Sequence, residues 1–220
     1  MSLNTILETP HYVAYQRATD RSIAIELRED ATDVASDRRP SMTVKHVEED
    51  GTVNYYEEAT SETQNKWKRA LGPLLAKFVV KPAVQLEGNK FTGNVTSSAL
   101  FEFPRGYKLY THKKGDHYDP RKDNYLIGSQ HVRAFRSPQE FFLHAKWLME
   151  GQAYNSDGTR ACGCCYCNPA VTQSDIARQY GTGHISDKPR RQRTSRPRPA
   201  TSGVIQAKDY TKFNVSSKSS

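Results

Sequence analysis

The sequence has no long apolar run, and no stretch of it approaches the ~20 apolar residues that a membrane helix needs. Its first residues, MSLNTILETPHY, lack the basic start and the apolar core of a secretory signal. Hydrophobic residues make up 36% of the 220 residues, and the mean hydropathy is -0.78. We therefore expect an intracellular chain with no membrane partner, in which a compact middle region lies between poorly ordered ends.

The sequence also lacks the short motifs that mark common catalytic sites. It contains no G-x-S-x-G elbow, no H-E-x-x-H helix, no P-loop and no G-x-G-x-x-G loop. It shows no internal repeat with a period of 20 to 50 residues. These absences favour a protein that acts by binding, and we predict that it is not an enzyme.

Cysteine is absent outside one short segment, RACGCCYCNP, which contains Cys162, Cys164, Cys165 and Cys167. Intracellular thiols stay reduced, which disfavours a disulfide framework. Cysteines at positions i, i+2 and i+5 can surround one ion, and a closed zinc site wants four thiolate or imidazole ligands. We predict that Cys162, Cys164 and Cys167 bind zinc with His144, which precedes them in a helix. Cys165 is the alternative fourth ligand, although neighbouring residues project to different sides and we prefer His144. Reduced structural thiols and redox chemistry are the alternatives to zinc binding.

Positive charge is in excess and is clustered. The formal net charge is +8, and the stretch KPRRQRTSRPR at residues 188–198 contains no acidic residue. Such an arm repels itself and stays solvated, so it can bind phosphates, including those of RNA, or serve as a nuclear-import signal. A disordered tail without a partner is the alternative. We expect residues 170–220 to form a disordered basic tail.

The first hundred residues contain three recognisable segments. Residues 1–40 are expected to be poorly ordered. Residues 41–100 are expected to form a hairpin, MTVKHV and TVNYYEE around Asp50-Gly51, and then a helix that starts with a capping box at Ser61 and Gln64. Its apolar stripe consists of Trp67, Ala70, Leu71, Leu74, Leu75 and Phe78. Gly72-Pro73 predicts a kink or two short helices, and residues 82–100 read as a connector with at most one strand.

Residues 101–169 are the most informative part of the chain. Residues 107–110 and 124–127 favour strands, and the polar stretch 111–122 between them is expected to be a loop. The tetrapeptide SPQE at residues 137–140 combines an N-cap serine, a proline in the first turn and a capping glutamate. The helix that follows should cover the sheet with Phe141, Ala145 and Leu148. The fold class is therefore α+β, with a small antiparallel sheet packed by one helix.

The stretch HKKGDHYDPRK within this region is strongly basic. Cations between two strands can reach across phosphates while the sheet holds the ends of the loop in place. A solvated hairpin tip is the alternative reading of the same residues.

Four motifs in this order carry a resemblance: FPRGYKLYTHKKG, DNYLIGS, AFRSPQEF and the C-x-C-x-x-C of residues 162–167. Over residues 42–169 the chain resembles the methyl-CpG-binding domain, and more closely the fungal cryptic loci regulator family of transcription-silencing proteins. The resemblance implies nuclear heterochromatin silencing, DNA as a partner, and docking of subunits of a histone deacetylase and remodeller complex. A bromo-adjacent-homology region, which that family has further on, is not found here.

The resemblance also implies a set of DNA-binding residues: His112, Lys113, Lys114, Arg121, Lys122, Asp123, Tyr125, Arg133 and Arg136. Arg136 matches one of the two arginines with which methyl-CpG domains read guanine, whereas the other position holds His112. Asp123 and Tyr125 match an aspartate and a tyrosine of the reading strand. We therefore expect weak, mainly electrostatic DNA binding. A protein-interaction scaffold that keeps the fold without binding DNA is the alternative.

Overall fold

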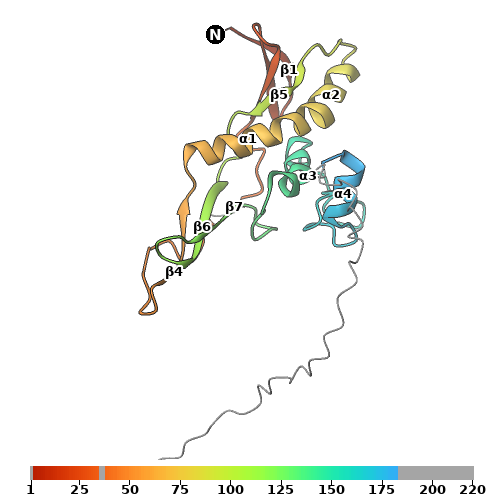
Figure 1. Cartoon of the computed structure of the whole chain (residues 1–220). Coiled ribbons are helices and arrows are strands. Elements are labelled where there is room, and N and C mark those ends of the chain that lie inside the picture. The colour runs from red at the N-terminus through yellow and green to blue at the C-terminus, as the bar shows by residue number, and fades with distance from the viewer. Residues whose placement is uncertain (1, 35–37, 183–220) are drawn as a thin grey trace, which may run out of the picture. The chain divides into compact units, whose positions relative to one another are not determined.

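The computed structural model describes residues 2–34 and 38–182 (Figure 1). The basic run at residues 188–198 and the predictions made for it lie outside the described residues. The fold class is α+β, as the sequence predicts, and it is built on two small sheets. None of the helices in the described ranges is long and apolar enough to cross a membrane.

The first sheet has four strands in the order β1-β2-β3-β5. They comprise β1 (Leu3–Glu8), β2 (Tyr12–Arg17), β3 (Ser22–Leu27) and β5 (Asn94–Leu100). The first three are antiparallel neighbours, and β5 joins β3 in parallel. The expectation that residues 1–40 are poorly ordered is therefore wrong for residues 3–27, which form three strands. Each strand buries only a few apolar side chains, such as Ile23 and Ile25 in β3. The polar composition of residues 1–40 therefore does not reveal that these strands pack into a sheet.

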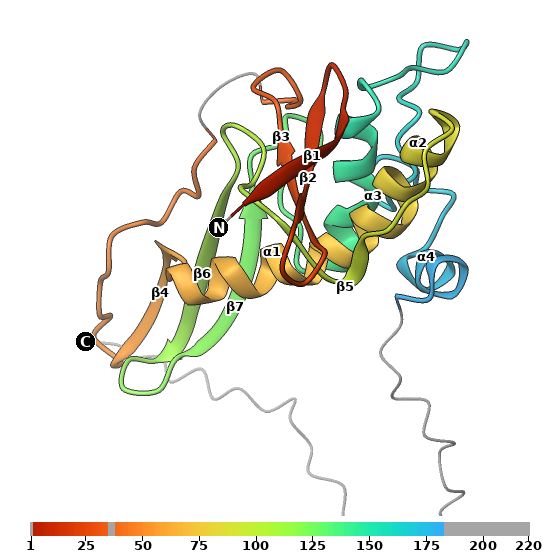
Figure 2. The same cartoon turned by 90° about the horizontal axis from the view of Figure 1, so that it is seen from above.

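One continuous helical segment follows β4 and runs past both sheets (Figure 2). It consists of α1 (Ser61–Leu75), a π-helical turn η1 (Ala76–Val80) and α2 (Lys81–Leu86). Two short helices divided at Gly72-Pro73 is the wrong prediction, since Pro73 lies inside α1 and the wider hydrogen bonding of η1 comes just after it. The alternative, a kink at Pro73, stays a prediction. The N-cap is Thr60 rather than Ser61, because the Thr60 hydroxyl accepts from the Thr63 N–H at 3.3 Å.

Gly72 allows α1 to lie directly on β5. A Cβ atom at this position would be 2.2 Å from the carbonyl oxygen of Ser98 and 2.4 Å from the Cα of Ala99. Trp67, Leu71 and Leu75 are buried, as the apolar stripe predicts, whereas Ala70 is exposed. The helix and the sheet thus meet backbone to backbone along this face.

The second sheet has three antiparallel strands in the order β4-β6-β7. Its strands are β4 (Thr52–Glu58), β6 (Lys108–Asp116) and β7 (Arg121–Ile127). The hairpin predicted for residues 42–58 forms only one bridge, between Val47 and Val53, and β4 pairs along its length with β6 instead. The loop predicted for residues 111–122 is also wrong: both strands extend into it and leave residues 117–120 as the turn.

The helix predicted at Ser137 is present as α3 (Pro138–Met149). The Ser137 hydroxyl accepts from the Glu140 N–H at 3.2 Å, and Phe141, Ala145 and Leu148 are buried. The helix packs chiefly beside α1, and the ring of Phe141 lies beside Tyr107, the residue just before β6.

A further helix, α4 (Gln173–Tyr180), lies within the range 170–220 that was predicted to be disordered, so that prediction is wrong for this segment. Thr172 and Asp175 cap its first turn reciprocally, and Ile176 packs into the core. The Thr-x-x-Asp spacing was the signal in the sequence for this helix.

Candidate metal centre and basic aromatic pocket

The four side chains predicted to bind metal come together in the structure: His144, Cys162, Cys164 and Cys167. Their ligand atoms all lie within 4.8 Å of one another. His144 Nδ1 is 3.5 Å from Cys162 Sγ, 3.9 Å from Cys164 Sγ and 3.6 Å from Cys167 Sγ. A tetrahedral zinc site with bonds of about 2.3 Å to sulfur and about 2.0 Å to nitrogen has N···S edges of about 3.5 Å. The cluster is therefore sized to hold a metal ion.

Local backbone bonds shape the cysteine segment around this point. Cys164 O accepts the N–H groups of Cys167 at 3.1 Å and of Asn168 at 2.9 Å, so the chain turns tightly there. The Cys167 N–H also points at Cys164 Sγ, 3.4 Å away. Helix α3 supplies His144, which is completely buried, from the opposite side. This cysteine turn of residues 162–167, the knuckle, thus packs the segment after α3 against that helix.

A buried carboxylate stands behind the histidine. Asp33 Oδ2 lies 3.3 Å from His144 Nε2 and accepts the Ser129 hydroxyl at 2.6 Å, while the Tyr107 hydroxyl donates to Asp33 Oδ1. This bonding places the Nε2–H of His144 on the carboxylate and leaves Nδ1 for the sulfur atoms. Sequence reasoning missed Asp33, because it lies in a stretch with no recognisable pattern.

Hydrogen bonds and burial shift the pKa values of the cluster in opposite directions. Burial by itself lowers the pKa of His144. Its hydrogen bonds with Asp33, Cys164 and Cys167 together have the larger effect and raise the pKa to about 10. Burial raises the pKa of Asp33, yet hydrogen bonds from His144, Ser129 and Tyr107 hold it below its usual value. Hydrogen bonds from Cys162 and Cys164, together with His144, lower the pKa of Cys167. The site favours a thiolate, the form of cysteine that binds metals.

Cys165 lies outside the cluster, as expected for a residue next to Cys164. Its Sγ faces Gln173 Oε1 at 3.6 Å, at the start of α4. Burial raises the pKa of the Cys165 thiol, which keeps it protonated and unreactive.

The predicted DNA-binding residues of the two strands lie on opposite faces of the second sheet. The register pairs His112 with Asp123 and Lys114 with Arg121, and side chains two residues apart share a face. One face therefore carries His112, Lys114, Arg121, Asp123 and Tyr125. The other face carries Lys113 and Lys122, which oppose each other across the strands. One flat partner cannot contact all of them.

Several of these charges are already paired. Lys113 Nζ is 2.7 Å from Glu57 Oε1, and Arg121 Nε is 2.8 Å from Asp123 Oδ2. Lys114 is exposed and has no ion pair with the described residues. Lys114 thus offers its charge to a partner, whereas Lys113 and Arg121 are partly neutralised.

His112 serves as a neutral aromatic side chain. Its ring stacks on Tyr56 at a centroid distance of 4.2 Å, and its Nε2 lies 2.7 Å from Asn54 Oδ1. Burial lowers the pKa of His112, although the Asp123 carboxylate acts in the opposite direction. His112 therefore does not replace the charge of the arginine that the resemblance places here.

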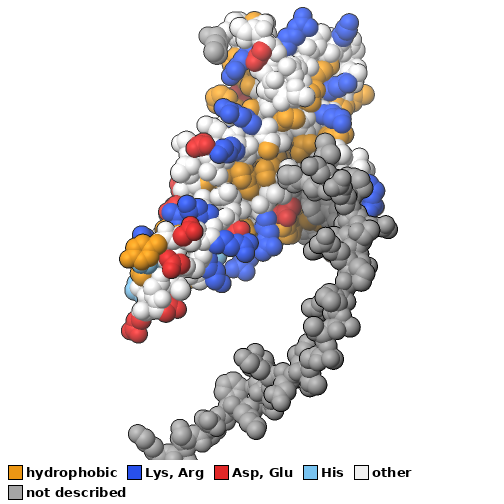
Figure 3. Space-filling view, in the orientation of Figure 1, with side chains coloured by type: hydrophobic (Ala, Val, Ile, Leu, Met, Phe, Trp, Pro, Cys, Tyr) orange, Lys and Arg blue, Asp and Glu red, His pale blue; other side chains and the backbone are white. Residues whose placement is uncertain are grey.

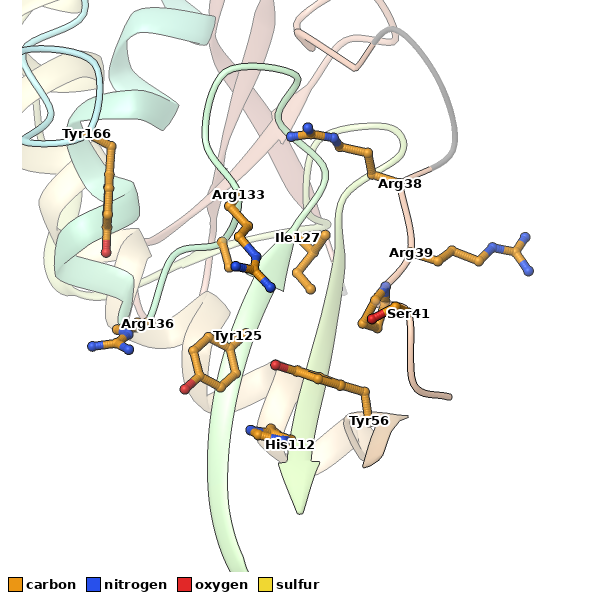
Figure 4. Close-up of a pocket in the computed structure, with 12 residues that line it drawn as sticks. Arg38, Arg39, Ser41, Tyr56, His112, Tyr125, Ile127, Arg133, Arg136 and Tyr166 are labelled. Atoms are coloured by element: carbon orange, nitrogen blue, oxygen red, sulfur yellow. The ribbon is translucent and has the colours of Figure 1, made fainter. Parts of the chain in front are cut away.

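A pocket of about 700 Å³ opens beside this face of the sheet (Figure 4). It is lined by Arg38, Arg39, Pro40, Ser41, Tyr56, His112, Tyr125, Ile127, Arg133, Ala134, Arg136 and Tyr166. None of these lining residues is acidic. The structure thus brings His112, Tyr125, Arg133 and Arg136 together, as the resemblance implies. It also adds residues 38–41, for which the only sequence signal was the pair of arginines before Pro40.

On the neighbouring surface, basic and acidic side chains also lie in separate places. In Figure 3, Lys and Arg side chains gather where the second sheet meets the helices, and Asp and Glu side chains lie at the tip of the sheet. The Arg136 guanidinium is 6.0 Å from the centre of the Tyr125 ring. The basic residues and the aromatic rings therefore form one surface.

Comparison with known proteins finds a family match for the central segment. Residues 99–167 match the family described as transcription-silencing protein, cryptic loci regulator Clr2. This confirms the resemblance to that family drawn from the sequence. No curated protein matches the chain. One solved structure, "Structure of Clr2 bound to the Clr1 C-terminus", aligns with 21% identity and a TM-score of 0.40, over 57% of this chain and 29% of that chain.

Proposed function

We propose that this chain, whose residues 99–167 match the Clr2 transcription-silencing family, is a nuclear chromatin factor that binds DNA through the surface around Tyr125, Arg133 and Arg136. The observation that carries the proposal is the absence of acidic side chains among the residues that line the pocket there. Cations that no acidic side chain in the lining neutralises attract DNA, because its phosphates release their counterions on binding.

Two further parts of the proposal rest on the family match. The chain works in the nucleus as a silencing factor, and it docks subunits of a histone deacetylase and remodeller complex. It acts by binding and carries out no catalysis itself. The methyl-CpG-binding-domain likeness of the second sheet stays a prediction. We expect little selectivity for methylated CpG, because neutral His112 stands where an arginine would read guanine.

A matched pair of lysines tests the DNA-binding face. We expect Lys114→Ala to weaken binding of a 16-base-pair duplex about threefold to tenfold at low salt and to reduce the salt slope by about one. Lys122→Ala removes the same charge from the opposite face of the sheet and should change the affinity little. The measurement is fluorescence anisotropy over a salt series. Equal losses in the two variants would show that the face is not the determinant.

A protein-interaction scaffold is the second candidate function, and His112 favours it. Its ring is held by Tyr56 and Asn54 rather than directed at a partner, so one base-reading position of the resemblance is lost. Pull-down from nuclear extract with and without nuclease separates the two functions. A scaffold of this kind keeps its partners after the DNA is destroyed.

We also propose that the ion held by His144, Cys162, Cys164 and Cys167 is zinc. Three thiolates and one imidazole at tetrahedral spacing are a donor set that zinc prefers in closed structural sites. With all four positions taken by protein atoms, none is left for water or a substrate, so the role is structural. In this site Asp33 orients the His144 ring, and the ion ties the cysteine segment to α3.

Asp33 provides a test of the site that leaves every ligand in place. We expect Asp33→Asn to lower zinc affinity about 10- to 100-fold, because the amide bonds His144 Nε2–H more weakly than the carboxylate does. Competition with a chromogenic chelator measures this affinity. Asp30→Asn, an exposed position in the same segment, serves as the control. Unchanged affinity in Asp33→Asn would remove Asp33 from the metal site.

A further inference from the structure

The pocket beside the second sheet combines two kinds of side chain in separate places. Tyr56 and His112 are half-buried and stack on each other, with the Tyr125 ring 6.0 Å from Tyr56. Arg133 and Arg136 are exposed at the rim, and Arg38 approaches from the N-terminal segment (Figure 4). Uncharged rings thus lie inside, and cations lie around the opening.

This arrangement suits a ligand that has a flat ring at one end and an anionic group at the other. A volume of about 700 Å³ falls within the range of pockets that hold small ligands. Flat bases stack on aromatic side chains, and phosphates pair with arginine. A nucleotide has both parts, joined over the span of a sugar.

A base inside a closed duplex shows only its edge in the grooves, so the rings of a concave pocket cannot stack on it. Stacking needs a base that has left its neighbours, as in single strands, bulges or extruded nucleotides. Phosphopeptide sites rely on arginine clusters and do not require stacked rings. The aromatic content of this pocket therefore favours a nucleotide over a phosphorylated side chain.

We propose that the pocket binds one unpaired nucleotide of DNA, with its base against Tyr56 and Tyr125 and its phosphate between Arg133 and Arg136. The inference rests on the proposed DNA-binding function and names the part of the DNA that this site takes. Arg38 contributes positive charge from outside residues 99–167, and its Nη1 is anchored on Ser129 O at 2.7 Å. The N-terminal segment thus completes a site whose other charges come from the matched segment.

The test compares a perfect duplex with the same duplex carrying one bulged nucleotide, by anisotropy with the full chain. We expect the bulged duplex to bind about 5- to 100-fold more tightly, the range of one stacked base. Tyr125→Leu, which replaces the aromatic ring with a smaller aliphatic side chain, should remove this preference. Arg133→Ala should weaken binding of the bulged duplex, whereas Lys122→Ala, which has the same charge change on the opposite face, should preserve the preference.

Small probes separate this inference from the proposed function. Deoxycytidine monophosphate should compete for the pocket better than deoxycytidine or inorganic phosphate alone. Equal affinity for perfect and bulged duplex would overturn the inference and leave duplex binding standing. If neither duplex bound while the monophosphate did, the proposed function would fail and the nucleotide site would remain. Tighter binding of phosphotyrosine than of the monophosphate would overturn the inference in favour of a phosphopeptide.

Discussion

Replacing Cys162 with serine is expected to abolish binding of the proposed zinc ion and to destabilise the protein by at least about 3 kcal/mol, because a structural zinc site contributes its binding energy to folding. Cys162 is buried beside His144 Nδ1, with Cys164 and Cys167 completing the set. Serine keeps the size of the side chain but replaces the thiolate that the ion needs. The measurements are metal content by mass spectrometry and the free energy of unfolding in urea.

Cys165→Ser is the matched control, because it makes the same chemical change three residues away. Its sulfur faces Gln173 rather than the cluster, so we expect full metal content and a loss of stability below about 1 kcal/mol. Native protein without any metal, and equal small losses in the two variants, would identify the cluster as reduced structural thiols. Loss of metal in Cys165→Ser would instead show that the wrong four ligands are assigned.

Replacing Gly72 with valine is expected to cost about 3 kcal/mol or more, because α1 and β5 touch through their backbones at this point. A Cβ atom would lie 2.2 Å from Ser98 O and 2.4 Å from Ala99 Cα, and both of these atoms belong to the backbone. Overpacking normally costs about 1 to 3 kcal/mol, and here the contact is with main chain of the first sheet, which cannot turn aside. The free energy of unfolding in urea measures this loss.

Ala70→Val is the control for this substitution. Ala70 is exposed on the same helix, so valine there adds the β-branched side chain without the clash. We expect a loss below about 0.7 kcal/mol, the difference in helix propensity. If the two variants lost the same stability, the close approach of α1 to β5 would be contradicted.

Local chemistry made several features predictable. The serine and proline at residues 137 and 138 predict the start of α3, since the Ser137 hydroxyl accepts the Glu140 N–H and Pro138 has no N–H to satisfy. The Glu140 carboxylate accepts from the Arg136 N–H, just before the helix. The spacing of Cys162, Cys164 and Cys167 predicts the knuckle, because a short chain must turn to bring them together. Each of these signals depends on neighbours in sequence, and each reappears in the fold.

The predictions that failed concern structure that depends on residues distant in sequence. The sheet of residues 3–27 is stabilised by α1 and β5, which are distant in sequence. The basic stretch from Thr111 to Lys114 looked like a loop, yet β4 pairs with it and Glu57 neutralises Lys113. Charged residues form strands when a partner strand supplies the hydrogen bonds and the opposite charge, and neither can be read from the stretch itself.

The sequence by itself determined the α+β class, the family resemblance, the start of α3 and the three cysteines that cluster, because these follow from motifs and short spacings. The tertiary structure decided which charges remain available. It placed Lys113 and Lys122 on the face opposite Tyr125, put Asp33 behind His144, and brought Arg38 to the pocket. Strand register and long-range packing set these placements, and a single sequence does not encode either in neighbouring residues.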